Sequence, residues 1–308
     1  MHLETPSARF GPVTVYFGEK SGKYPDGNQL IVQGGDTVVA FDTPQVANRL
    51  GPVFDDHVDM VVLGHVHEDH MAGLHRLPGV PVHVHELDVE AARSWEGLSR
   101  HFGYPPAVME PMRTKLDVDF HYTPRPDAVS YTDGAVWELG GGVRVRALHL
   151  PGHTAGHCAL FVEPVGLVFI GDIELSSFGP YYGDATSSLS DFRRSLARLA
   201  ELDASVWVTS HHKGVYTDRS AFLAALRSYA ARIDEREAVV IERLRRGPCS
   251  LGELVSGGLF YPAGYKSLWT EPVERRAISQ HLDELVEAGR VIAPATSAAG
   301  EGHYRLLA

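Results

Sequence analysis

The sequence of 308 residues has little cysteine, no long apolar run and no excess of positive charge. Its two cysteines, Cys158 and Cys249, are too few and too far apart for a disulfide framework, which is typical of a reducing compartment. No segment stays apolar for the roughly 20 residues that a membrane helix needs. The first residues have neither the basic nor the apolar region of a secretion signal. We therefore expect a cytoplasmic protein that does not bind membranes.

The formal net charge of −11, from 39 acidic and 28 basic residues, argues against a surface made to bind a polyanion. Apolar residues make up 44% of the sequence and charged residues 22%, which is ordinary for a globular protein. The length is greater than that of most single domains, so two domains with a large core are expected.

The densest group of candidate metal ligands is the stretch His65-Val66-His67-Glu68-Asp69-His70. It follows the apolar run 59–64, which is typical of a buried strand, and precedes 71–77, which predicts a short helix. Two histidines separated by one residue of extended chain point to the same side and can bind one metal ion. Asp69 and His70, at the turn into the helix, can reach a second ion. Imidazole and carboxylate together suit zinc better than magnesium or calcium. A histidine-rich surface loop is the weaker alternative, because four potential ligands fall within six residues.

The pattern His-x-His-x-Asp-His after an apolar strand resembles the first metal motif of the metallo-β-lactamase-fold hydrolases. Three later segments resemble the other motifs of that family, in the same order. They are the second metal motif at 150–157, the strand-end aspartate motif at 169–172 and the last ligand motif at 206–211. The resemblance implies an α/β fold, namely an αββα sandwich with its metals at one edge between the sheets. The sequence has two strand-rich halves that each end in helices, and this order suits such a sandwich.

The resemblance also implies a ligand set for two metal ions. The implied ligands are His65, His67 and His153 for one ion, Asp69, His70 and His211 for the other, and Asp172 as a bridge between them. We expect two zinc ions per chain, although the same ligands accept iron or manganese. Two such ions lower the pKa of a shared water toward neutrality, so a bridging hydroxide would attack a carbonyl carbon or a phosphorus, with Asp69 orienting it. Position 67 is a histidine, whereas the oxygen-reducing diiron relatives have an acidic residue at this position. This difference favours hydrolysis over redox chemistry.

Two further histidines lie beside the implied ligands. His157 is four residues beyond His153, and we expect it to support a ligand or the fold rather than to bind metal. His212 is adjacent to His211 and would be the true ligand if the preceding strand ended one residue later. The sequence leaves the choice between His211 and His212 open.

Polar residues at two other strand ends are candidates for the same edge of the sheet. Asp42 follows a buried strand and resembles the acidic residue that the family places beside its metal loop, with a plain turn or helix cap as an equal alternative. His83 and His85 end another strand, but no carboxylate–histidine pair follows them. We therefore expect both of these histidines to be structural.

Two segments are candidates for substrate contacts. Residues 94–127 are rich in proline and aromatic residues, and we expect a long irregular loop that acts as a substrate lid, with a packed surface excursion or dimer contact as the alternative. The segment 178–183 should overhang the metals. The glyoxalase II branch carries a lysine and a tyrosine there to contact glutathione, but Tyr181 stands at about the lysine position, which disfavours a glutathione thioester. Lactonase relatives use a tyrosine of this loop to hold the substrate carbonyl, so Tyr181 and Tyr182 are candidates, with packing as the alternative.

The chain beyond the four motifs predicts a second, smaller domain. We expect a catalytic domain over residues 1–230 and a C-terminal domain over 231–308. The stretch 218–246 predicts two helices, Ser250 and Glu253 have the spacing of a capping box, and an amphipathic helix at 272–288 precedes a terminal hairpin. This order resembles a winged helix. Because its basic residues are matched by acidic ones, we favour packing, dimerisation or a wall of the substrate cleft over DNA contact.

Three functions fit these observations. The first is a binuclear-metal hydrolase acting on a small acyl substrate (a thioester, ester or lactone), which the acidic surface and aromatic lid favour. The second is a metal-dependent phosphodiesterase or ribonuclease, because a smaller branch of the family joins this core to a winged helix and cleaves RNA; the balanced charge and the lack of an evident β-CASP insertion disfavour it. The third is a winged-helix DNA-binding regulator with a metal-bound sensor domain, which lacks a basic recognition helix. The missing secretion signal argues against β-lactam hydrolysis.

Overall fold

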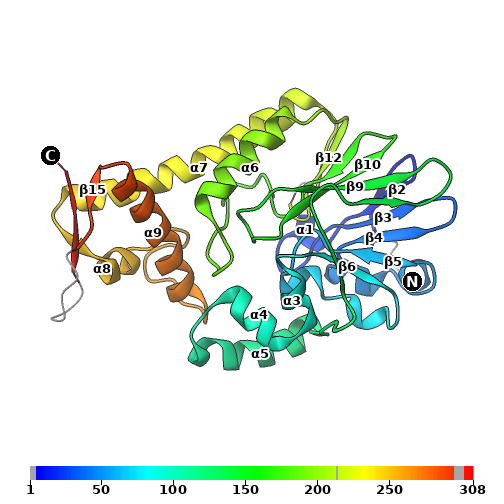
Figure 1. Cartoon of the computed structure of the whole chain (residues 1–308), viewed down its shortest axis with the longest axis horizontal. Helices are drawn as coiled ribbons and strands as arrows, with labels where there is room; N and C mark the ends of the chain where they lie inside the picture. The colour runs from blue at the N-terminus through cyan, green and yellow to red at the C-terminus, as the bar shows by residue number, and fades with distance from the viewer. Residues whose placement is uncertain (1–4, 213, 295–301, 308) are drawn as a thin grey trace.

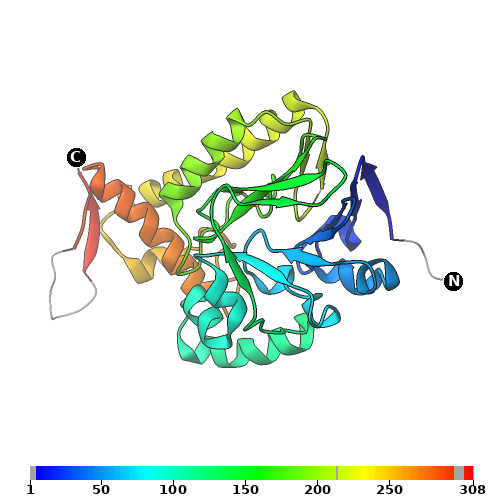
Figure 2. The ribbon, with the colours of Figure 1, turned by 45° about the vertical axis from the view of Figure 1, so that its right-hand side comes forward.

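Two β-sheets form the centre of the protein, and helices cover their outer faces (Figure 1). The structure is a computed structural model that describes residues 5–212, 214–294 and 302–307. Figure 2 shows the two sheets between α6 and α7 on one side and α3, α4 and α5 on the other. This layered arrangement is the αββα sandwich predicted from the sequence.

The strands of the first sheet lie in chain order, and those of the second sheet in the order β13-β12-β11-β10-β9-β8. The first sheet contains β1 (Ser7–Phe10), β2 (Val13–Tyr16), β3 (Gln29–Gln33), β4 (Val38–Phe41), β5 (Met60–Val62), β6 (Val82–His85) and β7 (Val129–Tyr131). The second contains β8 (Val136–Glu138), β9 (Arg144–His149), β10 (Cys158–Glu163), β11 (Leu167–Phe169), β12 (Val206–Val208) and β13 (Val215–Tyr216). Strands β2, β3 and β4 pair antiparallel, whereas β4 to β7 pair parallel.

The helices of the described chain are mostly short before residue 94 and longer after it. They are α1 (Glu19–Gly22), α2 (Pro52–Asp55), α3 (Val89–Arg93), α4 (Trp95–Phe102), α5 (Pro106–Phe120), α6 (Leu189–Glu201), α7 (Arg219–Arg245), α8 (Leu251–Ser256) and α9 (Thr270–Glu287). Three short 3-10 helices are η1 (Gln45–Arg49), η2 (Glu68–His70) and η3 (Leu74–Arg76). None of the helices in the described ranges is long and apolar enough to cross a membrane.

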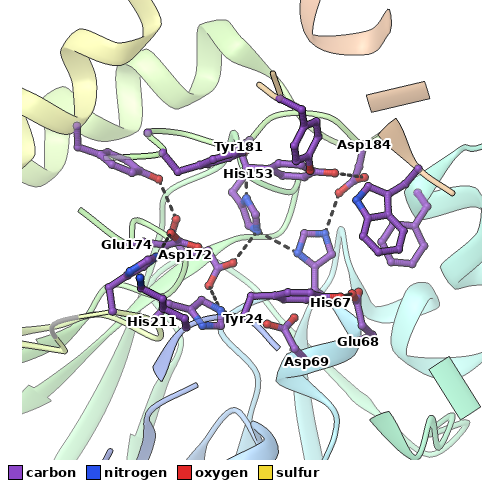
Figure 3. Close-up of a pocket in the computed structure, with 18 of the residues that line it drawn as sticks. Tyr24, His67, Glu68, Asp69, His153, Asp172, Glu174, Tyr181, Asp184 and His211 are labelled. Carbon is purple, nitrogen blue, oxygen red and sulfur yellow. Dashed lines mark hydrogen bonds and ion pairs between the residues drawn. The ribbon is translucent and has the colours of Figure 1, made fainter. Parts of the chain in front are cut away.

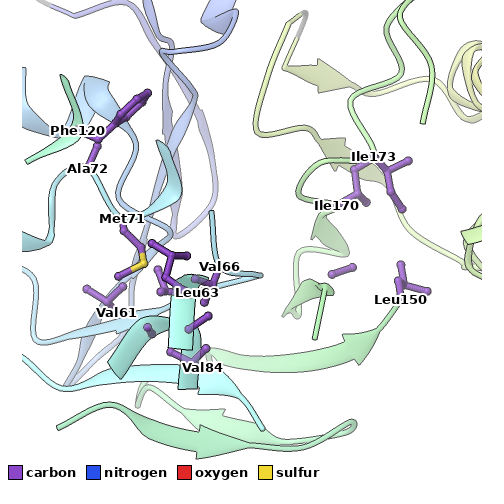
Figure 4. Packing of buried hydrophobic residues seen from close by; sticks show 14 of the residues in the cluster. Val61, Leu63, Val66, Met71, Ala72, Val84, Phe120, Leu150, Ile170 and Ile173 are labelled. Atoms are coloured by element: carbon purple, nitrogen blue, oxygen red, sulfur yellow. The ribbon is translucent and has the colours of Figure 1, made fainter. Parts of the chain in front are cut away.

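Alternating apolar residues of the two sheets form the core between them. Val13 and Val15 of β2 are fully buried, as are Leu160 and Val162 of β10, because side chains two apart in a strand lie on the same face. Burial of each such side chain contributes about 1.5–3 kcal/mol. A second cluster lies between the sheets and the helices, and Figure 4 shows Val61, Leu63 and Met71 from it. The strand ends that follow these buried runs are therefore held rigidly.

Residues 94–127 do not form the expected irregular loop; they form α4 and α5. Ser94 caps α4 by accepting a hydrogen bond from the backbone N–H of Gly97. Pro106 lies in the first turn of α5, where the missing N–H has no helical partner in any case. Pro111 lies inside the helix, where it removes a single backbone hydrogen bond. The prolines that argued against a helix are thus compatible with one, since a buried apolar face stabilises it.

The C-terminal region contains its own apolar cluster, which includes Val240 of α7, Leu254 of α8 and Ile278 of α9. The stretch 219–245 is one continuous helix, so the prediction of two helices is wrong. Ser250 and Glu253 form the predicted capping box. Strands β15 (Val291–Ile292) and β16 (His303–Leu306) pair antiparallel as the predicted hairpin, and β14 (Cys249–Ser250) joins β16. The hairpin tip lies outside the described residues, and the domain division at residue 230 stays a prediction.

Arg236 of α7 links this region to the loop that follows β11. Its guanidinium is buried, donates to the backbone carbonyls of Phe178 and Pro180, and lies 4.2 Å from the ring centroid of Phe260. It also donates to the Tyr182 hydroxyl at 3.4 Å. The hydrogen of the Tyr182 hydroxyl is therefore directed to Nε2 of His281 at 2.9 Å. His281 belongs to α9, and its pKa is lowered to about 3 by burial and by the charges of two arginines.

We expect His281 to make the folded state sensitive to acid. Because its pKa is near 3 when folded and near 6.5 when unfolded, only the unfolded chain binds this proton between those values. The free energy of unfolding should therefore fall by up to about 1.4 kcal/mol per pH unit as pH falls from about 6.5 toward 3. Urea unfolding with chelator at pH 7.5 and pH 5.0 should give a smaller difference for His281→Asn than for the wild type. Equal differences would contradict this role.

Candidate metal centre

Four loops that follow buried strands meet at one edge between the two sheets. They follow β5, β9, β11 and β12, and all seven predicted ligands on them are buried. The sheets approach closely there, because the Cys158 N–H donates to the carbonyl of Gly64 at 2.7 Å. A Cβ on Gly64 would lie 3.2 Å from the Cys158 carbonyl oxygen, so glycine permits this approach. The seven predicted residues are thus brought together (Figure 3 shows five of them).

Asp172 lies between two groups of imidazoles. Its Oδ2 is 3.2 Å from Nε2 of His153 and 3.8 Å from Nε2 of His65. Its Oδ1 is 3.1 Å from Nε2 of His70 and 3.5 Å from Nε2 of His211. Each carboxylate oxygen therefore faces a different pair of histidines, which is the arrangement that a ligand shared by two cations needs.

The remaining ligand atoms extend the two groups. His67 Nδ1 lies 3.0 Å from His153 Nε2, and Asp69 Oδ2 lies 3.1 Å from His211 Nε2. Within the described chain, both ring nitrogens of His65 are buried without a hydrogen-bond partner, and the Nε2 of His70 is buried with only ion-pair contacts to two carboxylates. Buried polar atoms rarely stay unpaired, so one nitrogen of His65 and the Nε2 of His70 fit a bound metal ion. The donor set of five imidazoles and two carboxylates suits a divalent cation such as zinc, and iron or manganese as well.

Asp42 orients His70 from behind. One carboxylate oxygen of Asp42 pairs with Nδ1 of His70 at 2.8 Å, and the other accepts the backbone N–H of Gly64 at 2.7 Å. Asp42 therefore lies beside the metal loop as predicted, and its main role is to hold His70 rather than to form a turn or cap a helix. Burial lowers the pKa of His70, but Asp172, Asp69 and Asp42 outweigh it and raise that pKa well above its ordinary value.

Backbone carbonyls orient two further imidazoles. The Nδ1 of His211 lies 2.9 Å from the carbonyl oxygen of Gly22, and the Nδ1 of His153 lies 3.1 Å from that of Tyr181. Each carbonyl fixes the tautomer in which Nε2 is free to bind a cation. The pKa of His211 is lowered by burial, but the charge of Asp172 and the hydrogen bond to Asp69 outweigh this and raise it to about 10.

The structure distinguishes His211 from its neighbours in sequence. His212 lies away from the cluster, with Nε2 3.1 Å from Oε2 of Glu174 and the side chain partly exposed. His157 uses Nδ1 against the carbonyl of Leu150 at 3.0 Å and accepts the Asp172 N–H through Nε2 at 3.2 Å. His157 therefore supports the loop of Asp172 and has no free nitrogen for a metal.

His83 and His85 lie outside the candidate metal groups of the described residues. His85 stacks on the ring of His149 at 4.3 Å, and Nε1 of Trp137 donates to Nδ1 of His83 at 3.4 Å. Burial lowers the pKa of both histidines. Their structural role is the predicted one.

A cavity of about 450 Å³ opens above the metal ligands (Figure 3). Most of the other side chains that line it are aromatic or acidic, and they come from several parts of the chain. They include Tyr24, Glu68, Phe102, Tyr104, Met112, Glu174, Phe178, Tyr181, Asp184, Tyr229, Tyr261, Tyr265 and Trp269. The predicted lid does contribute to this wall, although as helices rather than as a loop. The C-terminal region contributes the last three residues, so it walls the cleft as the sequence suggested.

The two candidate tyrosines have different positions. Tyr181 lines the cavity, and its hydroxyl lies 3.0 Å from that of Tyr104 and 3.2 Å from Oδ1 of Asp184. Tyr182 is fully buried, does not line the cavity and contacts His281 instead. This corrects the expectation for Tyr182, for which the packing alternative holds.

Asp184 is a site residue that the sequence analysis missed. This fully buried carboxylate accepts hydrogen bonds from the hydroxyls of Tyr104 and Tyr181 and pairs with Nε2 of His67 at 2.8 Å. Burial lowers the pKa of His67, but Asp184 outweighs it and raises that pKa to about 9. The residues Asp184 and His67 are 117 positions apart, and no local pattern marks the contact.

We expect Asp184→Asn to weaken metal binding in the group of His67 by about 10–100-fold, because a supporting carboxylate orients a ligand imidazole and raises its basicity. Competitive titration with a chromophoric chelator measures this affinity. Tyr104→Phe is the matched control, since it removes a hydrogen bond to the same carboxylate but leaves its contact with His67. An unchanged dissociation constant in Asp184→Asn would show that the carboxylate does not support a ligand.

Comparisons with known proteins agree with this geometry. A family model described as "Metallo-beta-lactamase superfamily" matches residues 27–211. A curated "Atrochrysone carboxyl ACP thioesterase" from Aspergillus chevalieri is 26% identical over 92% of this chain and 86% of that protein. A "Hydroxyacylglutathione hydrolase" from Methylococcus capsulatus is 33% identical over 42% of this chain and 45% of that protein. The crystal structure of a "metallo-beta-lactamase family protein" from Thermus thermophilus is similar with a TM-score of 0.68 and 26% identity, over 95% of this chain and 98% of that one.

Proposed function

The chain belongs to the metallo-beta-lactamase superfamily, and from this premise we propose that it is a metal-dependent hydrolase of small acyl substrates, thioesters first and esters or lactones next. The observation that carries the proposal is the position of Asp172, whose two oxygens face two histidine groups at the base of an aromatic cavity. The similarity to a thioesterase over most of both chains supports a thioester substrate.

In this proposal the seven buried side chains hold two divalent cations. His65, His67 and His153 would hold one, Asp69, His70 and His211 the other, and Asp172 both. When bound, such a pair of cations acidifies water and stabilises the negative charge that develops on an acyl oxygen. The preponderance of imidazole favours zinc, and the same donors also accept iron or manganese.

Asp69 is the proposed orienting residue for the attacking water. Burial raises the pKa of Asp69, but the charge of His70 and the hydrogen bond and charge of His211 outweigh it and lower the pKa below its ordinary value. The carboxylate is therefore ionised at neutral pH and can accept a hydrogen bond from water. Its side chain lines the cavity, so it lies within reach of a bound substrate.

Tyr181 is the proposed contact for the acyl carbonyl. Its hydroxyl lines the cavity and shares Asp184 with the hydroxyl of Tyr104. Because Tyr104 alone can satisfy that carboxylate oxygen, Tyr181 is free to donate to a substrate oxygen instead. Such a donor stabilises negative charge as it forms on the carbonyl oxygen.

We propose that the C-terminal region, predicted as residues 231–308, is a winged-helix-like unit with a packing role. Its helices α8 and α9 and its small sheet follow the order expected for that fold. We propose a small-molecule partner in preference to nucleic acid, because Glu68 and Glu174 line the cavity in addition to the acidic ligands. We also propose a cytoplasmic location and a homodimer, with a phosphodiesterase of the same fold as the alternative function.

The proposal is tested by metal analysis and a substrate screen on protein purified without a metal-binding tag. We expect about two divalent ions per chain, as a shared aspartate requires, and turnover of acyl thioesters that stops with chelator and returns with zinc. The panel should also contain p-nitrophenyl esters, lactones and bis-p-nitrophenyl phosphate. Turnover of the phosphodiester alone would favour the nuclease. If the metal-loaded protein hydrolysed none of these substrates, the proposed function would be contradicted.

A further inference from the structure

The loop between α8 and α9 brings aromatic side chains of the C-terminal region to the metal cavity. Tyr261, Tyr265 and Trp269, which we call the C-terminal aromatic wall, all line it. In Figure 1 this segment lies beside α4, far along the chain from the strands that hold the metal ligands. Phe102 and Tyr104, at the end of α4, line the same cavity. Aromatic residues from two distant parts of the chain therefore enclose the space above the ligands.

A buried carboxylate holds the C-terminal aromatic wall in place. Glu274 of α9 accepts the backbone N–H groups of Leu259, Phe260 and Tyr261 at 2.7, 3.0 and 2.8 Å. Its side chain is 1% exposed. Three charge-assisted hydrogen bonds to one carboxylate fix the backbone of the loop before any ligand binds. The backbone at Tyr261, where the wall begins, is therefore positioned before any ligand binds.

Ring contacts join the loop between α8 and α9 to the segment 178–183. Phe260, which precedes the wall, stacks on Tyr181 with centroids 5.6 Å apart and ring planes inclined by 22°. Tyr261 stacks on Tyr265 at 5.0 Å and 16°, and contacts Phe178 at 6.0 Å. At the end of α4, the ring of Phe102 lies parallel to that of the proposed ligand His67, with centroids 5.7 Å apart and planes inclined by 4°. Aromatic side chains that line a cavity can bind flat groups by offset stacking.

The charges around the cavity limit what those faces can bind. Apart from the proposed metal ligands, the charged lining residues among those described are Glu68, Glu174, Asp184 and Lys23. Asp184 is already paired with His67, and Glu68 accepts the hydroxyl hydrogen of Tyr24 at 2.9 Å. Single-stranded nucleic acids need aromatic faces together with a basic groove, and this lining is acidic. An uncharged, flat, apolar group is the occupant that fits.

We propose that the C-terminal aromatic wall selects planar aromatic acyl groups, so that the second region of the chain determines specificity at the metal site. The inference rests on the proposed acyl hydrolysis and adds the class of acyl group. The cavity volume of about 450 Å³ lies in the range of small-molecule sites. Within it, the acyl group would lie against the rings of Tyr265 and Trp269 while its carbonyl points to Tyr181 and the metal ligands.

The test compares acetyl, octanoyl and 2-naphthoyl thioesters of N-acetylcysteamine in the wild type and in Trp269→Ala. We expect the wild type to prefer the naphthoyl thioester, and Trp269→Ala to lower kcat/KM for it by about 10-fold or more while kcat/KM for acetyl changes less than about 2-fold. Tyr265→Ala should act in the same direction. Leu268→Ala is the matched control, because Leu268 is 42% exposed, adjacent to Trp269 and not part of the lining.

Each outcome decides the inference. An equal loss on all three thioesters in Trp269→Ala, or a wild-type preference for octanoyl over naphthoyl, would overturn it. If no thioester is hydrolysed, the proposed function fails, and calorimetric titration with uncharged 2-naphthamide tests the wall by itself. Binding that weakens by about 10-fold in Trp269→Ala but not in Leu268→Ala would support the aromatic site, whereas equal affinities, or no binding at all, would refute it.

Discussion

Asp172→Ala is expected to leave a folded protein that binds at most one divalent ion per chain and hydrolyses its substrate with kcat/KM lowered by at least about 10³-fold. No other described side chain offers one oxygen within 3.2 Å of His153 and another within 3.1 Å of His70. Without it, the two imidazole groups lose their shared anion. Burial raises the pKa of Asp172, but His70, His211 and His65 outweigh it and lower the pKa well below its ordinary value, so the missing group is a carboxylate.

The fold should tolerate this change because the backbone of Asp172 is anchored independently of its side chain. Its N–H donates to Nε2 of His157 at 3.2 Å, and its carbonyl accepts the hydroxyl hydrogen of Tyr229 at 3.0 Å. Circular dichroism and size-exclusion chromatography of the variant should therefore match those of the wild type. Inductively coupled plasma analysis then measures metal content on protein known to be folded.

Glu174→Gln is the matched control for the loss of one negative charge from the same cavity. Glu174 is two residues from Asp172 and lines the cavity, and its ion pair is with His212 rather than with His70 or His153. Its carboxylate also lies within 4.8 Å of ligand atoms of Asp172 and His211, so the variant tests whether it is a ligand too. We expect it to keep its metal and to lose less than about 10-fold in kcat/KM. If Glu174→Gln lost its ions while Asp172→Ala retained them, the shared ligand would have been assigned to the wrong carboxylate.

The convergence of the candidate ligands was predictable from sequence because each lies in a loop that follows a buried apolar strand. The apolar run 59–64 predicts a strand because it is short and rich in β-branched residues, and the polar residues beyond it then lie at the sheet edge. Asp42 could be recognised for the same reason, but its partner could not. The pairing of Asp42 with His70 depends on the parallel register of β4 and β5, which local sequence does not specify.

Features formed by distant contacts were not predictable. Asp184 lies in an irregular segment, and only the folded chain brings it to His67 and Tyr104. The helices within 94–127 were not predicted, because the prolines in this segment lower its helix propensity. The burial of Leu116 and Phe120 stabilises α5, and this tertiary effect is not visible in the local sequence. The aromatic wall depends likewise on Glu274, which binds a loop that precedes its own helix.

The replacement of His211 by asparagine should remove one of the two ions and lower kcat/KM by at least about 10²-fold, whereas His212→Asn should retain both ions and most of the activity. The two histidines are adjacent, yet they make different contacts. His211 directs Nε2 to Asp69 at 3.1 Å and Nδ1 to a backbone carbonyl at 2.9 Å. His212 has a left-handed backbone with φ of 60°, which turns its side chain toward Glu174 instead.

Asparagine is the informative replacement at both positions because it tolerates the left-handed backbone of His212, where alanine would add strain of its own. Metal content by elemental analysis, measured with kcat/KM on the same preparation, separates a lost ligand from a disturbed loop. A disturbed loop would lower activity in both variants while leaving two ions bound. If His212→Asn lost an ion and His211→Asn did not, the ligand would be His212, and the contact between His211 and Asp69 would be only a hydrogen bond that orients the carboxylate.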